Sequence, residues 1–390
     1  MHDALTPKKN HTQGPPHPNV TRFMRKTARS EEQLNFFDGK MHRVLKSGAA
    51  MPVLGLGVWK IPPSATADCV RSPLPVRCPF SNPREITASS RPQVYNALKL
   101  GWRAIDAACD YGNEVQVGEG ISRALKEGVC SRADLFITSK LWCTFHEPVR
   151  VEPALRRTLS HLQLDYLDLY LVHFPIPLRY VDPAARYPPG WFFDPSAAAP
   201  AMEWSRVPVG DTWAALEACA DKGLARALGV CNFNTALLRD LLFRAKRPVE
   251  VLQVELHPYL VQEKLVRFAQ SEGIVVTGFS PLGSASYVEI GMAAPTDSAL
   301  LEPAVRAIAE RVGATPAQVI LAWHLARGLT VVPKTVNHAR LAENLAAEKV
   351  VGKLTTEDVA AISALDKHRR FNDPGVFCEK AFNTFVPIYD

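Results

Sequence analysis

The sequence predicts a (β/α)8 barrel, on three observations. Its 390 residues are 47% hydrophobic, which is enough apolar material for one large core or two medium ones. From Leu54 onward, short aliphatic or β-branched runs alternate with helical patterns, and eight such β/α units in about 300 residues are typical of a barrel. A doubly wound parallel sheet is the alternative, but no G-x-G-x-x-G follows any run, so that fold's dinucleotide fingerprint is absent.

The eight predicted strands are mostly continuous apolar runs, as expected of a parallel sheet that is buried on both faces. In sequence order they cover residues 53–59, 103–108, 135–141, 167–173, 227–233, 251–257, 274–280 and 329–335.

Helical signals lie between these strands. The clearest is TPAQVILAWHLARG, in which Thr315 is the N-cap, Pro316 takes the first helical position and Gln318 completes a capping box. Gly328 ends this helix. A second example, GDTWAALEACADKG, places apolar residues on one face, namely Trp213, Leu216 and Ala220.

Two segments do not fit the pattern. Residues 1–40 are rich in His, Pro, Asn and Lys without sustained periodicity, and we interpret them as a disordered N-terminal extension of a barrel covering 41–390. Residues 70–93 hold five prolines in 24 residues and interrupt a pattern that becomes one amphipathic helix when they are removed. We hypothesise a retained intron or a gene-model error. The alternative is a surface insertion, which a stable fold can tolerate.

Composition excludes several classes of protein. The net charge of +6 comes from residues 1–50 and 70–93, and the remainder is slightly acidic, so we expect no nucleic-acid partner. No apolar run approaches 18 residues, so we expect no membrane span. The eight cysteines are scattered without a C-x-x-C pair or zinc spacing. That distribution favours reduced thiols in a cytoplasmic protein and no bound metal.

Polar residues stand at or near the ends of seven of the eight predicted strands. Barrel enzymes build their sites at the carboxyl ends of the strands, so we expect these side chains to form one site. They are Asp106, Lys140, His173, Asn232, Gln253 with Glu255, Ser280 and Lys334.

Tyr111 follows the second strand and completes a candidate proton donor. A free phenol has a pKa of about 10, and a neighbouring ammonium favours the phenolate and lowers that pKa. Lys140 can supply the ammonium, Asp106 can hold and balance it, and His173 can orient a carbonyl oxygen or share the proton. Taken singly, each residue suits a structural role, but together they indicate a general acid. Because no side chain is an obvious nucleophile for the carbonyl carbon, a cofactor hydride is the expected partner.

With these residues in view, the sequence resembles the aldo-keto reductases over about 41–390, apart from 70–93. The resemblance rests on LGLGVWK, IDAACDYGNE, ITSKLWC, LDYLDLYLVHFP, GVCNF, QVELHPY and VPKTVNHARLAENL. It implies that Asp106, Tyr111, Lys140 and His173 are the catalytic tetrad. Within the family the sequence is most similar to fungal-type D-xylose reductases, through DYGNE, HFPI, RYPPGWFF and RFNDP.

The resemblance also implies NADPH as cofactor. Asn232 and Gln253 would hold the nicotinamide carboxamide, Phe279 would stack under the ring, and a cationic helix start suits the 2′-phosphate. Glu289 matches a residue that would also permit NADH. The implied cofactor-binding residues are Asn232, Gln253, Phe279, Ser280, Leu282, Glu289, Lys334, Thr335, Asn337, Arg340 and Asn344. Cys231 stands where the family usually has serine, which removes one strong hydrogen bond to the carboxamide.

For the substrate, the resemblance implies an aldehyde such as D-xylose in its open form, reduced by a monomer or homodimer. Its implied contacts are Trp59, Asp110, Trp142, His173, Phe174 and Asn372, the last within a C-terminal tail over 367–390. Two other functions remain open on this barrel. One is a lyase that forms a Schiff base on Lys140. The other is a non-catalytic, NADPH-binding accessory protein.

Overall fold

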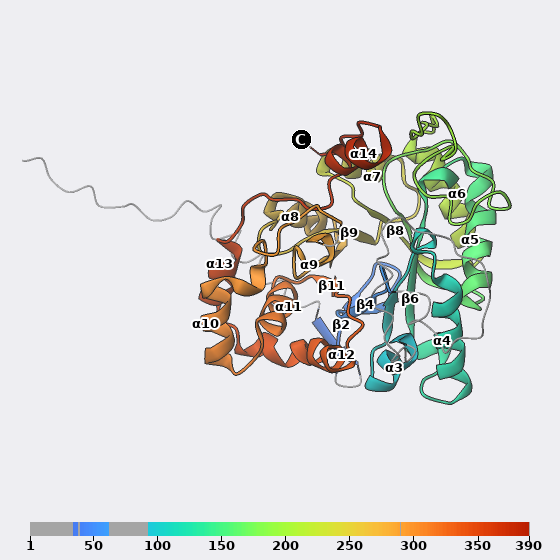
Figure 1. Cartoon of the computed structure of the whole chain (residues 1–390). Coiled ribbons are helices and arrows are strands. Elements are labelled where there is room, and N and C mark those ends of the chain that lie inside the picture. Colours follow the sequence, from blue (N-terminus) through green and yellow to red (C-terminus); the bar gives the residue numbers. More distant parts are fainter. Residues whose placement is uncertain (1–33, 38–39, 62–92, 289, 390) are drawn as a thin grey trace, which may run out of the picture.

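Eight parallel strands form one sheet in which each strand pairs with its neighbours in the sequence (Figure 1). The computed structural model describes residues 34–37, 40–61, 93–288 and 290–389. Within them, the parallel strands are β4 (Gly55–Gly57), β5 (Ala104–Asp106), β6 (Phe136–Leu141), β7 (Leu167–Val172), β8 (Ala225–Cys231), β9 (Val251–Glu255), β10 (Val275–Phe279) and β11 (Thr330–Val332).

The sheet closes between its first and last strands. Leu54 pairs in parallel with Val331, whose amide donates to the Val53 carbonyl at 2.9 Å, and the Gly57 amide donates to the Pro333 carbonyl at 3.0 Å. The (β/α)8 barrel is therefore confirmed, and the doubly wound alternative is wrong. Seven predicted strands contain a shorter observed one, and the prediction 227–233 overlaps β8, which has the same length but begins two residues earlier.

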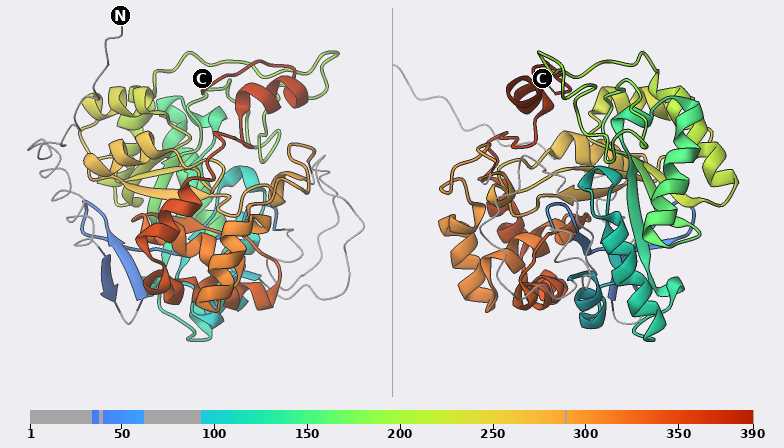
Figure 2. Two further views of the ribbon diagram at one scale, coloured as in Figure 1. Left: turned by 90° about the vertical axis from the view of Figure 1, so that its left-hand side faces the viewer. Right: turned by 45° about the vertical axis from the view of Figure 1, so that its right-hand side comes forward.

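Helices surround the barrel on its outside (Figure 2). In the described residues the α-helices are α3 (Gln93–Leu100), α4 (Glu114–Lys126), α5 (Pro148–Leu162), α6 (Val209–Asp221), α7 (Thr235–Arg244), α8 (Glu263–Ser271), α9 (Ala285–Val288), α10 (Pro303–Val312), α11 (Pro316–Ala326), α12 (His338–Leu345), α13 (Thr356–Ser363) and α14 (Pro374–Phe382). Short 3-10 helices add η3 (Cys109–Tyr111), η4 (Arg132–Asp134), η5 (Cys143–Phe145), η6 (Ala299–Leu301) and η7 (Ala346–Lys353).

Two of these helices form as their sequences predict. α11 begins after Thr315. The Thr315 hydroxyl accepts from the Gln318 backbone amide, and the Gln318 side-chain oxygen accepts from the Thr315 backbone amide. The predicted capping box is therefore confirmed. Gly328 follows the helix with φ of +78°. α6 buries Trp213, Leu216 and Ala220, the predicted apolar face.

A three-stranded antiparallel sheet closes the amino-terminal end of the barrel. Strands β1 (Leu34–Phe37), β2 (Lys40–Val44) and β3 (Ala50–Pro52) pair in order, and Leu45 and Met51 pack into the apolar cluster inside the barrel. The Ser47 amide donates to the Glu250 carboxylate at 2.8 Å. The predicted disordered segment therefore extends too far at its C-terminal end, because pairing with β2 orders residues 34–37. Residues 1–33 lie outside the described residues.

The predicted insertion at 70–93 lies outside the described residues except for Gln93, which begins α3. The Gln93 amide group donates to the Thr335 carbonyl at 2.8 Å, so α3 is attached beside the segment that follows β11. The retained-intron hypothesis stays a prediction.

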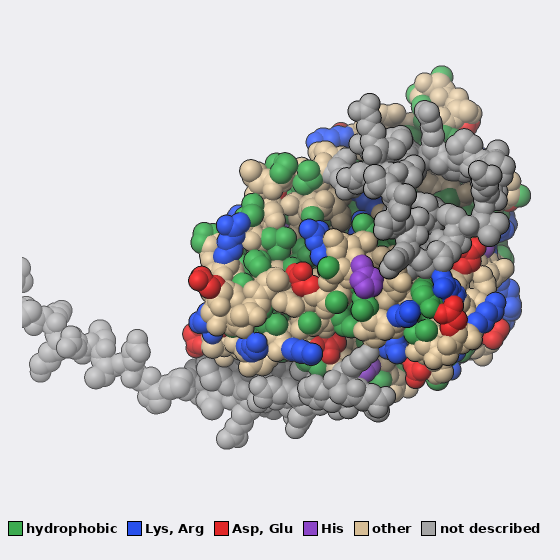
Figure 3. Space-filling model, turned by 60° about the horizontal axis from the view of Figure 1, so that its bottom comes forward, with side chains coloured by type: hydrophobic (Ala, Val, Ile, Leu, Met, Phe, Trp, Pro, Cys, Tyr) green, Lys and Arg blue, Asp and Glu red, His purple; other side chains and the backbone are tan. Residues whose placement is uncertain are grey.

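The surface in Figure 3 shows Lys and Arg interspersed with Asp and Glu, without a patch of one sign on that face. None of the helices in the described ranges has the length and apolarity that a membrane span requires. Six cysteines lie in the described residues, and each is a buried free thiol.

Replacing Gly118 should test how closely α4 and α5 pack. A Cβ at Gly118 would lie 2.3 Å from the His161 carbonyl oxygen and 2.7 Å from the Leu162 backbone. We expect Gly118→Ala to lower the free energy of unfolding by about 1–3 kcal/mol, because the helices must separate. Gly352→Ala is the control, since a Cβ there meets nothing within 4 Å. Equal stabilities in urea denaturation would contradict this packing.

Candidate active site

Four residues meet at the carboxyl ends of β5, β6 and β7. Asp106 is the last residue of β5, Lys140 lies in β6, His173 follows β7, and Tyr111 ends η3 in the loop after β5. The Lys140 ammonium donates to the Asp106 carboxylate at 2.8 Å and to the Tyr111 hydroxyl oxygen at 3.1 Å. The sequence placed these residues at strand ends, and the structure brings them together.

The Lys140 ammonium is completely buried and all three of its hydrogens have acceptors. Its third bond goes to the Ala107 carbonyl at 3.0 Å. The other oxygen of Asp106 accepts from the Gln253 amide group at 2.8 Å. This geometry directs one donor of a buried cation at the phenol.

Charges and burial set the protonation states at this site. Burial by itself disfavours the charged form of Lys140, but Asp106 and Tyr111 outweigh it and raise the pKa of Lys140 above its ordinary value. Burial, together with the Lys140 charge, lowers the pKa of His173 well below its ordinary value. At neutral pH the site therefore holds an ammonium and an uncharged imidazole.

The net shift of Tyr111 opposes the sequence-based expectation. Burial raises the pKa of Tyr111 above that of a free phenol, while Lys140 acts in the lowering direction and Asp106 against it. The predicted lowering is wrong as a net direction, because the expectation counted the ammonium and not the loss of water. Tyr111 is thus a fully protonated phenol at neutral pH.

His173 contacts Tyr111 through its ring. The two ring centroids lie 5.7 Å apart in an edge-on arrangement. Among the described residues, the buried Nδ1 of His173 has no hydrogen-bond partner. A buried ring nitrogen without a partner is costly, so this atom adds to the burial that disfavours a charged His173 ring.

An aromatic wall stands beside the four polar residues. Trp142 and Phe174, both predicted substrate contacts, are buried with ring centroids 6.1 Å apart. Trp191 packs on both, at 4.7 and 5.3 Å, and α14 adds Phe377 and Phe382. Trp191 was not among the predicted contacts. The motif RYPPGWFF marked its loop, but only the folded protein shows which aromatic residue turns inward.

Two other predicted substrate contacts differ in their surroundings. Asp110 is partly buried beside Tyr111, and burial raises the pKa of its carboxyl to about 7. Trp59 is half-buried after β4, with its ring 6.0 Å from Tyr287 and 4.8 Å from the Lys60 ammonium.

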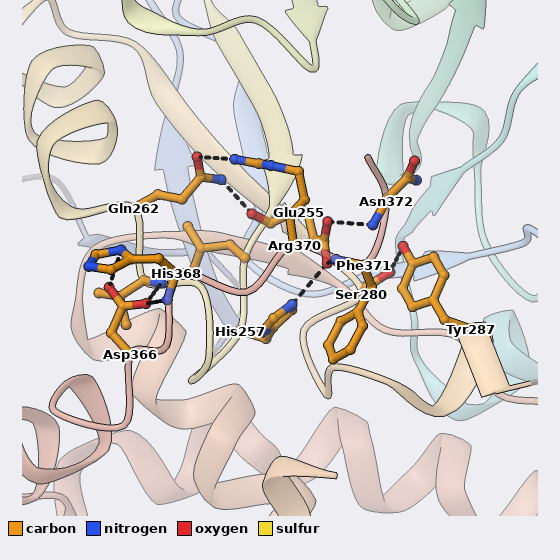
Figure 4. Close-up of polar contacts among 12 residues, drawn as sticks. Glu255, His257, Gln262, Ser280, Tyr287, Asp366, His368, Arg370, Phe371 and Asn372 are labelled. Carbon is orange, nitrogen blue, oxygen red and sulfur yellow. Dashed lines mark hydrogen bonds and ion pairs between the residues drawn. The ribbon is translucent and has the colours of Figure 1, made fainter. Parts of the chain in front are cut away.

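Glu255 anchors the C-terminal tail, as Figure 4 shows. This fully buried carboxylate accepts from the amides of Phe371 and Asn372, both at 2.8 Å, and from the His257 ring at 2.9 Å. Glu255 was a predicted site residue, and its contacts give it the task of holding the tail. Asn372 is thereby placed at the rim, near Tyr287, whose hydroxyl bonds Ser280 at 2.8 Å.

Of the two predicted carboxamide-binding residues, Asn232 directly follows β8 and Gln253 lies in the middle of β9. The Asn232 amide group donates to the His173 carbonyl at 2.8 Å and to the Cys231 sulfur at 3.2 Å, and its oxygen accepts from Tyr389 at 3.3 Å. Phe279 packs in the cluster inside the barrel with Cys231. Leu282 is partly buried in the loop after β10, and Glu289 lies outside the described residues.

The predicted phosphate-binding residues gather at the start of α12. Asn337 caps this helix by accepting from the Arg340 amide at 3.2 Å, and the Thr335 hydroxyl accepts from the Asn337 amide at 3.0 Å. Arg340 is exposed, Lys334 is partly buried and Asn344 is buried. An exposed guanidinium at a helix N-terminus suits an anionic group.

The chain is similar in sequence and in fold to known proteins. The model of the Aldo/keto reductase family matches residues 83–367. The chain is 48% identical over 332 residues to the probable NAD(P)H-dependent D-xylose reductase of Arthroderma otae, covering 85% of this chain and 92% of that protein. It is 43% identical over 348 residues to the NAD(P)H-dependent D-xylose reductase of Aspergillus niger, covering 88% and 98%. The solved aldose reductase of Schistosoma japonicum matches with a TM-score of 0.70 and 32% identity, covering 88% and 97%.

Removing Asp106 should destabilise the fold, because it leaves the Lys140 ammonium buried without its counter-charge. We expect Asp106→Ala to cost about 3–5 kcal/mol of unfolding free energy in urea denaturation at pH 7. The control is Asp221→Ala, which breaks an exposed pair with Arg247 and should cost less than about 1 kcal/mol. Similar losses of unfolding free energy in both variants would show that the buried Lys140–Asp106 pair stabilises the fold no more than an exposed pair does.

Proposed function

The chain belongs to the aldo/keto reductase family, and from this premise we propose that it reduces the aldehyde of an open-chain aldose such as D-xylose to an alcohol. In this proposal NADPH supplies the hydride and Tyr111 supplies the proton. The observation that carries the proposal is the buried Lys140 ammonium, 3.1 Å from the Tyr111 hydroxyl. The names of the similar proteins support the substrate class and the cofactor.

The cofactor fits the residues present at the barrel rim. When bound, NADPH supplies a hydride to a carbonyl carbon. Arg340 and Lys334 at the start of α12 would hold its 2′-phosphate, and these cations favour NADPH over NADH. Asn232 and Gln253 would bind the carboxamide. Dual use of NADH through Glu289 stays a prediction.

Tyr111 acts as general acid in this proposal. As negative charge develops on the substrate oxygen, the phenol donates its proton, because an alkoxide is a stronger base than a phenolate. The raised pKa of Tyr111 keeps it protonated at physiological pH. The Lys140 ammonium then stabilises the phenolate at short range in a site with little water, and Asp106 keeps that ammonium charged.

His173 orients the substrate oxygen. Its lowered pKa keeps the imidazole uncharged, so it can donate one hydrogen bond to the carbonyl oxygen without adding a second cation beside Lys140. Asp110 and Asn372 would bind hydroxyl groups of the sugar, while Trp142 and Phe174 would cover its carbon skeleton.

The two alternative functions have less support. A Schiff-base lyase needs an uncharged, nucleophilic Lys140, whereas Asp106 raises the pKa of this amine and all three hydrogens are engaged. A non-catalytic accessory protein has no need of four complete catalytic residues. A cytoplasmic location and the monomeric or dimeric state stay predictions.

Replacing Tyr111 by Phe tests the proton donor. We expect kcat for xylose reduction to fall by a factor of about 10²–10⁴, while the Kd for NADPH, measured by fluorescence titration, stays the same. Tyr166→Phe is the control, since Tyr166 stacks between Arg132 and Arg226 away from the site. An unchanged kcat in Tyr111→Phe would overturn this mechanism.

The pH dependence should reveal Asp110, whose pKa is raised to about 7. Above that pH the carboxylate is ionised and accepts hydrogen bonds from sugar hydroxyls more strongly, so kcat/KM for xylose should rise through about pH 7. An aldehyde without hydroxyl groups, such as butanal, should lack this step, and Asp110→Asn should abolish it for xylose. The same step with both substrates would assign the titration to another group.

A further inference from the structure

Glu114 is a buried carboxylate that the proposed mechanism does not use. It begins α4 and is 2% exposed. The Ser139 hydroxyl donates to it at 2.7 Å, Thr158 at 3.3 Å and the Tyr187 hydroxyl at 3.2 Å. His161 Nδ1 lies 3.7 Å away. These partners come from β6, α5 and the long loop after β7, so one carboxylate ties three parts of the fold together.

This carboxylate lies close in the sequence to the catalytic residues. Glu114 follows Tyr111 by three residues, and its partner Ser139 immediately precedes Lys140. The loop approaches the same place from outside. Pro188 lies next to Gly112, where an added Cβ would meet it at 3.5 Å.

Tyr187 belongs to residues 174–208, which contain no helix or strand of the structure, only the isolated bridge from Leu178 to Trp204. Side-chain anchors must therefore hold residues 186–193. Two hydrogen bonds join that stretch to the barrel: Tyr187 to Glu114, and Trp142 to the Gly190 carbonyl at 3.0 Å. Arg186 braces it internally by donating to the Pro189 carbonyl at 2.7 Å.

This anchoring sets the position of the Trp191 ring. Its ring packs on Trp142 and Phe174 on one side, and stacks on Phe382 of α14 with centroids 5.6 Å apart. The green loop and the red helix α14 lie together at one end of the molecule in Figures 1 and 2. Trp191 thus completes the aromatic wall, and its position depends on a loop held partly by Tyr187.

We propose that Tyr187 is a positioning residue for the aldehyde pocket: its bond to the buried Glu114 carboxylate fixes residues 186–193 so that Trp191 closes the wall beside Trp142. The inference rests on the proposed function, because it describes how that pocket is built. Tyr187 acts through Trp191 and has no part in proton transfer or in cofactor binding.

Enzyme kinetics can test whether Tyr187 acts through Trp191. The variants to compare are Tyr187→Phe, Trp191→Ala and the double variant. We expect Tyr187→Phe to raise KM for xylose by about 5- to 20-fold, with kcat within about twofold and an unchanged Kd for NADPH. The double variant should be no worse than Trp191→Ala, since both changes remove the same element. Additive losses, or a loss confined to kcat, would overturn the proposal.

Hydrogen exchange followed by mass spectrometry tests it without activity. Amides of residues 186–193 should exchange at least about fivefold faster in Tyr187→Phe than in the unchanged protein. Thr158→Val is the matched control, because it removes another donor to Glu114 from α5 and should leave the exchange of this loop unchanged. Equal exchange in Tyr187→Phe would overturn the proposal even if xylose reduction is confirmed.

Two further outcomes can be told apart: a Tyr187→Phe variant that does not fold, and an unchanged protein that reduces no aldehyde. Should Tyr187→Phe fail to fold, Glu114→Gln weakens the same acceptor, and exchange of 186–193 should rise in that variant as well; no rise would count against the proposal. If the unchanged protein reduces no aldehyde, the proposed function fails, whereas the exchange experiment still decides whether Tyr187 holds the loop.

Discussion

The structure depends on one buried cation and the three acceptors that surround it. Lys140 has no contact with solvent, so its charge is tolerable only because Asp106, the Ala107 carbonyl and the Tyr111 oxygen all accept from it. Parallel pairing of β5 and β6 brings Asp106 beside Thr138, which places the carboxylate within reach of the lysine further along β6. Closure of the barrel then prevents these strand ends from moving apart.

Around this rigid centre, the rest of the rim is built from less regular segments. Glu255 holds the tail by two backbone amides, and Glu114 holds the loop after β7 through Tyr187. Both are fully or almost fully buried carboxylates at the carboxyl side of the barrel. An ionised carboxylate accepts several hydrogen bonds at once, so it suits a place where a loop must be fixed without a strand or helix of its own.

Burial decides the chemistry as much as charge does. Lys140 favours the phenolate of Tyr111, yet the loss of water around the phenol raises its pKa overall. The result suits the proposed proton donation, since in that proposal Tyr111 must remain protonated until charge appears on the substrate. Sequence reasoning could name the ammonium as a perturbing charge, but it could not weigh that charge against desolvation, because exposure is a property of the folded protein.

The sequence alone determined the barrel, its eight strands, the caps of α11 and the positions of Asp106, Tyr111, Lys140 and His173, because hydrophobic periodicity and strand-end polarity are local patterns. Only the tertiary structure decided which polar groups pair and which aromatic residue faces inward. Gln253 supports Asp106 from a strand far along the sequence, residues 34–37 are ordered by pairing with β2, and Trp191 reaches the wall through a loop of no regular structure. Each of these contacts depends on how the folded protein brings its segments together, and no local pattern records such a contact.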